Sequence, residues 1–166
     1  MQRIISFACL LFFTLPIRAQ EQSLPTAPSF TVRDINNKLI STDSLIAKGP
    51  LIIDFWASWC APCMAEFNAL KKIAAEHKDK NLQVLAISQD TPSEVAKVKQ
   101  TVKTRRVPFI VAMDKDKSIG QKYFVNALPS LYLIGIDGKV HLRTRGFVTG
   151  DDVKLEKEIR EFLEKE

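Results

Sequence analysis

The chain has 166 residues, of which 46% are hydrophobic and 26% are charged, and these proportions are typical of a soluble globular domain rather than of a disordered or collagen-like chain. Three cysteines are too few for a disulfide-rich scaffold. The 24 basic and 19 acidic residues are spread along the chain without a long basic block, which argues against a nucleic-acid partner. The length predicts one domain with a core of its own.

The N-terminal segment 1–19 is typical of a secretory signal peptide, because Arg3 precedes an apolar run at 4–15 and a small residue, Ala19, follows it. The run is shorter than the roughly 20 residues of a membrane-spanning helix, although a retained anchor stays an alternative. We expect cleavage after Ala19, then a linker at 20–29 and a single domain at 30–166. Such a chain resides in the periplasm or another extracytoplasmic space.

The rest of the chain alternates short apolar strands with amphipathic helices. The pattern predicts a mixed α/β sheet with helices on both of its faces. In chain order we first expect a hairpin of 30–33 with 39–40 around the turn 34–37, a buried strand at 51–56, and a helix that begins at Cys60. A strand at 82–88, a helix from Pro92 capped by Thr91, a strand at 109–112 and a short helix within 114–124 should follow. The chain should end with a hairpin of 130–136 with 140–145 around Asp137 and Gly138, and a C-terminal helix whose apolar face carries Leu155, Ile159, Phe162 and Leu163.

The chemistry is concentrated in a Cys-x-x-Cys pair, Cys60 and Cys63, placed directly after the buried strand and at the start of a helix. Unpaired N–H groups and the helix dipole lower the pKa of a thiol in the first helical turn. A thiolate is the species that attacks a disulfide. Cys60 is therefore the candidate nucleophile and Cys63 the resolving thiol, with Pro62 fixing the backbone between them.

Other uses of the two cysteines stay open at this point. A structural disulfide would close only a very small loop and would stabilise little. Zinc needs four ligands, and His77 and His141 do not have the spacing of a zinc site, so we expect no metal site. Copper bound by the two thiolates remains an alternative, since thiolates favour Cu(I).

Two carboxyl residues extend the candidate site. Asp54 lies within the apolar strand, where burial raises the pKa of a carboxyl, and such a group can relay the proton of Cys63. The alternative is an Asp satisfied by backbone N–H groups at a strand end. Glu66 follows Cys63 by three residues and shares its helix face, so it can tune or deprotonate the pair, unless it is a solvated surface residue.

At these residues the sequence resembles the thioredoxin-fold proteins and, more narrowly, the exported TlpA/ResA-like thiol-disulfide oxidoreductases. The resemblance spans about residues 25–165. It is carried by segments 27–30, 54–63, 66–67, 107–114 and 124–140, with Trp-Cys-x-Pro-Cys as the most specific motif.

The resemblance implies a thioredoxin fold with an N-terminal hairpin and an inserted helix-strand unit at 89–117. It also implies a cis peptide bond before Pro129, which would face the cysteines, and a substrate strand paired with the backbone of Leu128. We expect Trp59, Pro62, Leu128 and Pro129 to contact the substrate. Strand 82–88 lacks the lysine that partners the buried Asp of thioredoxin, so Asp54 is expected to be harder to ionise.

The function expected from the sequence is reduction of disulfides in other exported proteins, without a bound cofactor, because the two sulfurs carry the electrons. The resemblance implies a membrane-embedded thiol reductase as the electron donor and, for some members, a role in cytochrome c maturation. Three alternatives remain: a disulfide-donating oxidant, a peroxidase of the peroxiredoxin group, and a non-enzymatic copper chaperone or binding module.

Overall fold

The computed structural model describes residues 25–166. The expected signal peptide at 1–19, and residues 20–24 of the expected linker, lie outside the described residues. Within 25–166, every helix is too short or too polar to cross a bilayer.

Within residues 25–166, seven strands and five α-helices follow one another much as the apolar pattern predicts. They are β1 (Thr31–Arg33), β2 (Leu39–Ser41), α1 (Thr42–Ile46), β3 (Leu51–Trp56), α2 (Ala61–Glu76), β4 (Gln83–Ser88), α3 (Val95–Arg105), β5 (Ile110–Met113), α4 (Ser118–Lys122), β6 (Ser130–Ile134), β7 (Val140–Arg145) and α5 (Asp151–Leu163), with short 3-10 turns at Lys78–Lys80 and Pro92–Glu94.

The central sheet has the strand order β5-β4-β3-β6-β7, and β3 in its middle is buried along its whole length. Strands β3, β4 and β5 run parallel, whereas β6 and β7 are antiparallel to their neighbours. Two successive crossovers, β3-α2-β4 and β4-α3-β5, step in the same direction, and right-handed crossovers of this kind place both helices on one face. The expected mixed sheet of a thioredoxin fold is confirmed.

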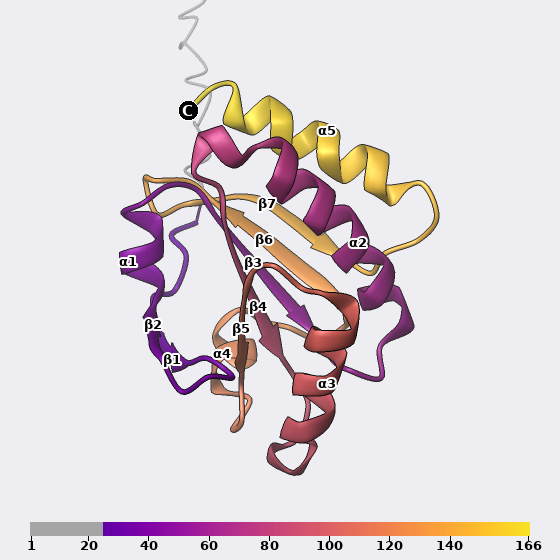
Figure 1. Cartoon of the computed structure of the whole chain (residues 1–166). Coiled ribbons are helices and arrows are strands. Elements are labelled where there is room, and N and C mark those ends of the chain that lie inside the picture. Colours follow the sequence, from indigo (N-terminus) through magenta and orange to yellow (C-terminus); the bar gives the residue numbers. More distant parts are fainter. Residues whose placement is uncertain (1–24) are drawn as a thin grey trace, which may run out of the picture.

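Each face of the sheet has its own hydrophobic core because successive strand residues point to opposite faces. On one face Ile52 and Trp56 of β3 lie in a cluster with apolar residues of α2, α3 and α5. On the other face Ile53 and Phe55 belong to a cluster that includes Leu45 of α1 and Ile119 of α4. Figure 1 shows α2 and α5 side by side above the sheet, with α1 and the β1–β2 hairpin on the opposite flank.

The structure adds two local features to the expected elements. Helix α1 was not expected; it begins after Ser41, whose side chain accepts a hydrogen bond from the N–H of Ser44. At Pro92 the chain forms a 3-10 turn before α3 begins at Val95. The Glu94 carboxylate closes this turn by accepting from the N–H of Thr91 at 2.9 Å.

The first described residues are held against the β6–β7 hairpin. The N–H of Ala27 donates to the carbonyl of Gly138 at 2.9 Å, and Pro25 accepts from the N–H of Val140 at 2.9 Å. The small β1–β2 sheet continues from there, and its turn reaches the edge strand β5, where the N–H of Ile35 donates to Val111. The hairpin therefore covers part of a sheet edge that would otherwise be open.

Candidate active site

The two cysteines lie where β3 passes into α2. A turn after β3 is closed by the N–H of Cys60 donating to the carbonyl of Ala57 at 3.0 Å. Cys60 is the N-cap of α2, and its sulfur accepts the N–H of Cys63 at 3.3 Å. The two residues form a disulfide with their Cα atoms 5.3 Å apart. The same N–H and the positive end of the helix would stabilise a thiolate at Cys60 after reduction.

The two sulfurs differ in their access to solvent. Cys60 retains 5% exposure and lines an open groove of ≈ 520 Å³, whereas Cys63 is fully buried. Segment 59–62 forms one side of this groove and segment 125–128 forms the other, with Gln89 and Lys117 completing the lining. A substrate in the groove would therefore meet Cys60 first.

The residues expected to contact a substrate gather around the groove. Trp59 is 62% exposed and lines it together with Pro62 and Leu128. The peptide bond between Leu128 and Pro129 is cis. Pro129 itself is buried next to the lining, and its carbonyl accepts the N–H of Gly146 at 2.8 Å.

Asp54 of β3 and Glu66 of α2 are both fully buried where α2 packs over β3. Asp54 lies opposite Ala86 of β4, so no lysine faces it across the strand pair. All four carboxyl oxygens lack a hydrogen-bond partner of normal geometry within residues 25–166. Burial raises the pKa of each carboxyl, and the charge of Asp54 raises the pKa of Glu66 further. Glu66 is thus not a solvated surface residue, and Asp54 is not satisfied by backbone N–H groups.

A third buried carboxylate, which the sequence patterns did not predict, supports the cysteine turn. Asp90, just beyond the end of β4, accepts the N–H of Ser58 at 2.8 Å and the hydroxyl of Ser58 at 2.6 Å. It also accepts the hydroxyl of Ser88 at 2.7 Å. These bonds attach the turn that contains Trp59 and Cys60 to the end of the neighbouring strand, β4. The position of Asp90 in the sequence could have indicated this role: it follows a predicted strand, and the carboxyl ends of parallel strands meet at the same edge of a sheet.

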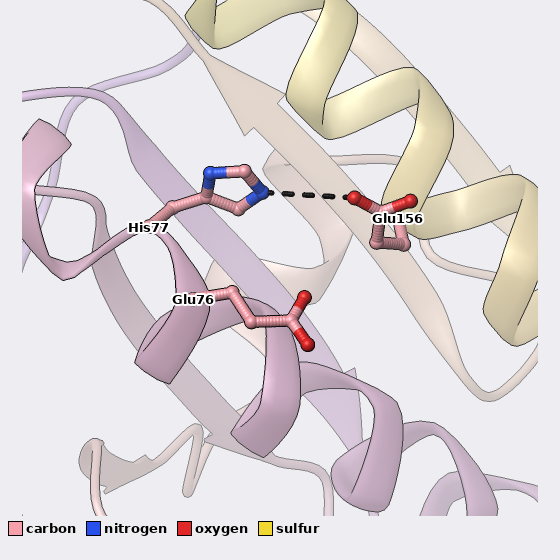
Figure 2. A group of neighbouring side chains, drawn as sticks. All are labelled: Glu76, His77 and Glu156. Carbon is pink, nitrogen blue, oxygen red and sulfur yellow. Dashed lines mark ion pairs between the residues drawn. The ribbon is translucent and has the colours of Figure 1, made fainter.

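A second polar cluster lies at the far end of α2. Figure 2 shows Glu76 and His77 of that end beside Glu156 of α5, where His77 Nε2 lies 3.8 Å from Glu156 Oε1. The same oxygen is 3.1 Å from Nε of Arg160, which already supplies a cation to it. Helix α2 has 16 residues, so His77 lies about 20 Å along the helix from Cys63. The cluster joins α2 to α5 and is separate from the cysteines.

Comparison with known proteins agrees with this geometry. Residues 25–143 match the model of the AhpC/TSA family. The thiol-disulfide oxidoreductase ResA of a Bacillus cereus strain is 38% identical over 114 residues, which cover 69% of this chain and 64% of that protein, just under two thirds of its length. ResA of Bacillus subtilis (strain 168) is 30% identical over 151 residues, covering 88% and 83% respectively.

A solved structure shares the same architecture. The crystal structure from Chlorobium tepidum assigned to DsbE, a thiol:disulfide interchange protein, superposes with a TM-score of 0.78 at 28% identity and covers 84% of this chain and 96% of that one. The strand order, the disulfide at the start of α2 and these similarities agree with one another. The chain therefore belongs to the AhpC/TSA family of thioredoxin-fold proteins and, within it, to the ResA-like thiol-disulfide oxidoreductases.

Proposed function

We propose that this protein reduces disulfides in other proteins by dithiol-disulfide exchange through Cys60 and Cys63. The observation that carries the proposal is the asymmetry of the pair: Cys60 lines the groove at the N-cap of α2, and Cys63 lies buried one helical turn behind it. This arrangement suits a nucleophile that meets the substrate and a resolving thiol that meets only the nucleophile. The similarity to proteins named ResA supports the same interpretation.

The reaction begins with both cysteines reduced. The Cys60 thiolate attacks one sulfur of the substrate disulfide, the substrate S–S bond breaks, and the second substrate sulfur leaves and takes a proton from water. Cys63 then loses its proton and attacks Cys60 Sγ, so the mixed disulfide breaks and the other substrate sulfur leaves as a thiol. Two electrons pass to the substrate, and the Cys60–Cys63 disulfide forms.

We assign the proton transfer at Cys63 to the buried carboxyls. Glu66 lies one helical turn after Cys63 on the same buried face of α2, above Asp54 of β3. Their raised pKa values keep at least one proton on the pair at neutral pH, and a carboxylate with a raised pKa is a stronger base than an exposed one. Asp54 and Glu66 therefore take up the Cys63 proton and return it to solvent or substrate.

The setting of the reaction is part of the proposal. The signal-peptide pattern at 1–19 supports a place outside the cytoplasm, where disulfides persist. The substrates are disulfide-containing exported proteins. A reductant in an oxidising space needs a supply of electrons, for which we propose a membrane-embedded thiol reductase. Cytochrome c maturation is one process that such a reductant would serve.

Two substitutions test the order of events. We expect Cys60→Ser to abolish reduction of a disulfide-bonded peptide, because no nucleophile then lines the groove. We expect Cys63→Ser to accumulate a mixed disulfide through Cys60, detected as a mass increase that dithiothreitol removes. Turnover retained in the Cys60→Ser protein would refute the mechanism.

The direction of electron flow is tested by the reduction potential of the Cys60–Cys63 couple, measured by equilibrating the protein with thiol buffers. A value near −270 mV, about that of thioredoxin, would support a reductant. A value near −120 mV, about that of DsbA, would show that the protein is an oxidant.

A further inference from the structure

Among residues 25–166, Lys117 supplies the only charged side chain that lines the groove beside Cys60. The rest of its lining consists of apolar residues, the cysteine and two amides. Resting on the function proposed above, we propose that Lys117 selects substrates that carry an acidic residue close to the cysteine attacked by Cys60. Lys117 is then a specificity-determining residue, and the substrate class is an acidic segment flanking a disulfide.

Lys117 is held in place in the turn between β5 and α4. Its N–H donates to the carbonyl of Asp114 at 3.2 Å, and its backbone adopts a left-handed conformation with φ of 63°. Its ammonium group donates to the carbonyl of Gln89. Gln89 is itself fixed, because its N–H donates to Trp56 at 2.7 Å and its side chain donates to Asp114 at 3.0 Å. The charge therefore sits at a defined place on the groove wall.

The acidic groups near Lys117 are occupied by other donors. The Asp114 carboxylate accepts the N–H groups of Ile119 at 3.1 Å and Gly120 at 2.7 Å, and Asp116 accepts the N–H of Ser118 at 3.1 Å. Within residues 25–166, Lys117 forms no ion pair with a carboxylate. An ammonium group has three donors, of which the Gln89 carbonyl uses one.

A partly buried cation that forms no ion pair among the described residues favours a carboxylate that enters the groove and disfavours a second cation. A glutamate or aspartate within a few residues of the substrate cysteine would supply that carboxylate. A lysine at the same place would be repelled. The preference should weaken with ionic strength, because the groove is open to solvent and salt screens exposed charges.

The test uses two series of peptides that are closed by a disulfide. In one series the residue before a cysteine is Glu, Gln or Lys, and in the other series the residue after it is varied in the same way, with the rest of the peptide unchanged. The rate of their reduction by the reduced protein is divided by the rate with dithiothreitol, which removes intrinsic differences between the peptides. We expect the Glu peptide of at least one series to exceed its Gln counterpart by about two- to five-fold in kcat/KM at low salt, the range of a partly screened ion pair. The Lys peptide should be slowest.

Three variants assign the preference to one side chain. Lys117→Gln should remove it, Lys117→Arg should retain it, and Lys115→Gln should leave it unchanged, because exposed Lys115 lies outside the groove lining. Equal rates for Glu and Gln peptides in both series, or a preference that survives in Lys117→Gln, would overturn the proposal. Neither result would affect the proposed reduction itself, whose failure would appear as no reduction of any peptide.

Discussion

The carboxyls of Asp54 and Glu66 show how burial acts on single residues. Both groups are fully buried and lack hydrogen-bond partners of normal geometry among the described residues, so their charged forms are poorly solvated. Burial therefore raises the pKa of each group above that of the same group in the unfolded chain. The folded protein consequently binds more protons than the unfolded protein at neutral pH.

This difference in proton binding predicts the sign of a pH effect on stability. A carboxyl whose folded pKa is raised contributes stability that is fully present below its unfolded pKa of about 4 and is lost as pH rises through the folded pKa. Between pH 5 and pH 8 we expect the unfolding free energy of the natural protein to fall as pH rises, and that of Glu66→Gln to fall less. The two declines should differ by at least about 1 kcal/mol over this range, because a difference of one bound proton changes the unfolding free energy by about 1.4 kcal/mol per pH unit. Urea denaturation of both proteins across this pH range measures the difference in unfolding free energy.

A matched control and a second readout accompany this prediction. Glu161→Gln, at a half-exposed position of α5, should leave the pH dependence as it is. Glu66→Gln should also shift the pH profile of thiol reactivity, because Glu66 is proposed to exchange a proton with Cys63. A pH profile that does not move would remove Glu66 from the proton transfer, whatever its effect on stability.

At the scale of elements, α5 shows how one apolar stripe attaches a helix to the sheet. Leu155, Ile159 and Leu163 recur at four-residue spacing and are all buried. The opposite face carries ion pairs such as Lys157 with Glu161, which are exposed and contribute little. The stability that α5 contributes therefore comes mainly from its buried face.

We expect Ile159→Ala to lower the unfolding free energy by about 2–5 kcal/mol, because it removes a fully buried side chain and leaves a cavity beneath α5. Val153→Ala on the same helix, where the side chain is 70% exposed, should change it by less than about 0.5 kcal/mol. Thermal or urea unfolding of the two variants makes the comparison. Similar losses in both would contradict the assignment of the packing face.

At the scale of the whole molecule, the order of the strands sets a gradient of stability. Strand β3 is paired with β4 on one side and β6 on the other, and helices or the hairpin cover both of its faces. The two-stranded β1–β2 sheet has three residues in each strand and several exposed positions. Local opening should therefore cost least in the hairpin and most at the centre of the sheet.

Amide hydrogen exchange followed by mass spectrometry checks this gradient. We expect peptides from β3 and β6 to exchange last and those from β1 and β2 to exchange first. If the β1–β2 hairpin exchanged as slowly as β3, the hydrogen bonds between the hairpin and β5 would make the hairpin part of the same cooperative unit as the central sheet. The cysteine turn should exchange slowly as well, because the N–H of Ser58 is bonded to buried Asp90.

The local elements and the cysteine motif could be predicted from the sequence because their causes act within a few residues. Apolar spacing predicts β3 and α5, the Asp137-Gly138 turn predicts the β6–β7 hairpin, and a cysteine pair after a strand predicts a thiol at a helix start. The short helix α1 was missed, since five residues carry too little periodicity to be recognised.

Which distant residues share the site depends on how the sheet assembles, and this could not be predicted from local sequence. Gln89 and Asp90 follow β4, whereas Lys117 follows β5, and the two parallel crossovers bring these strand ends to the edge where β3 delivers Cys60. The electrostatic interaction between Asp54 and Glu66 depends in the same way on α2 folding back over β3. Local spacing reports neighbours along one element, but the groove, its lysine and the buried carboxyls arise from segments that meet only when the sheet assembles.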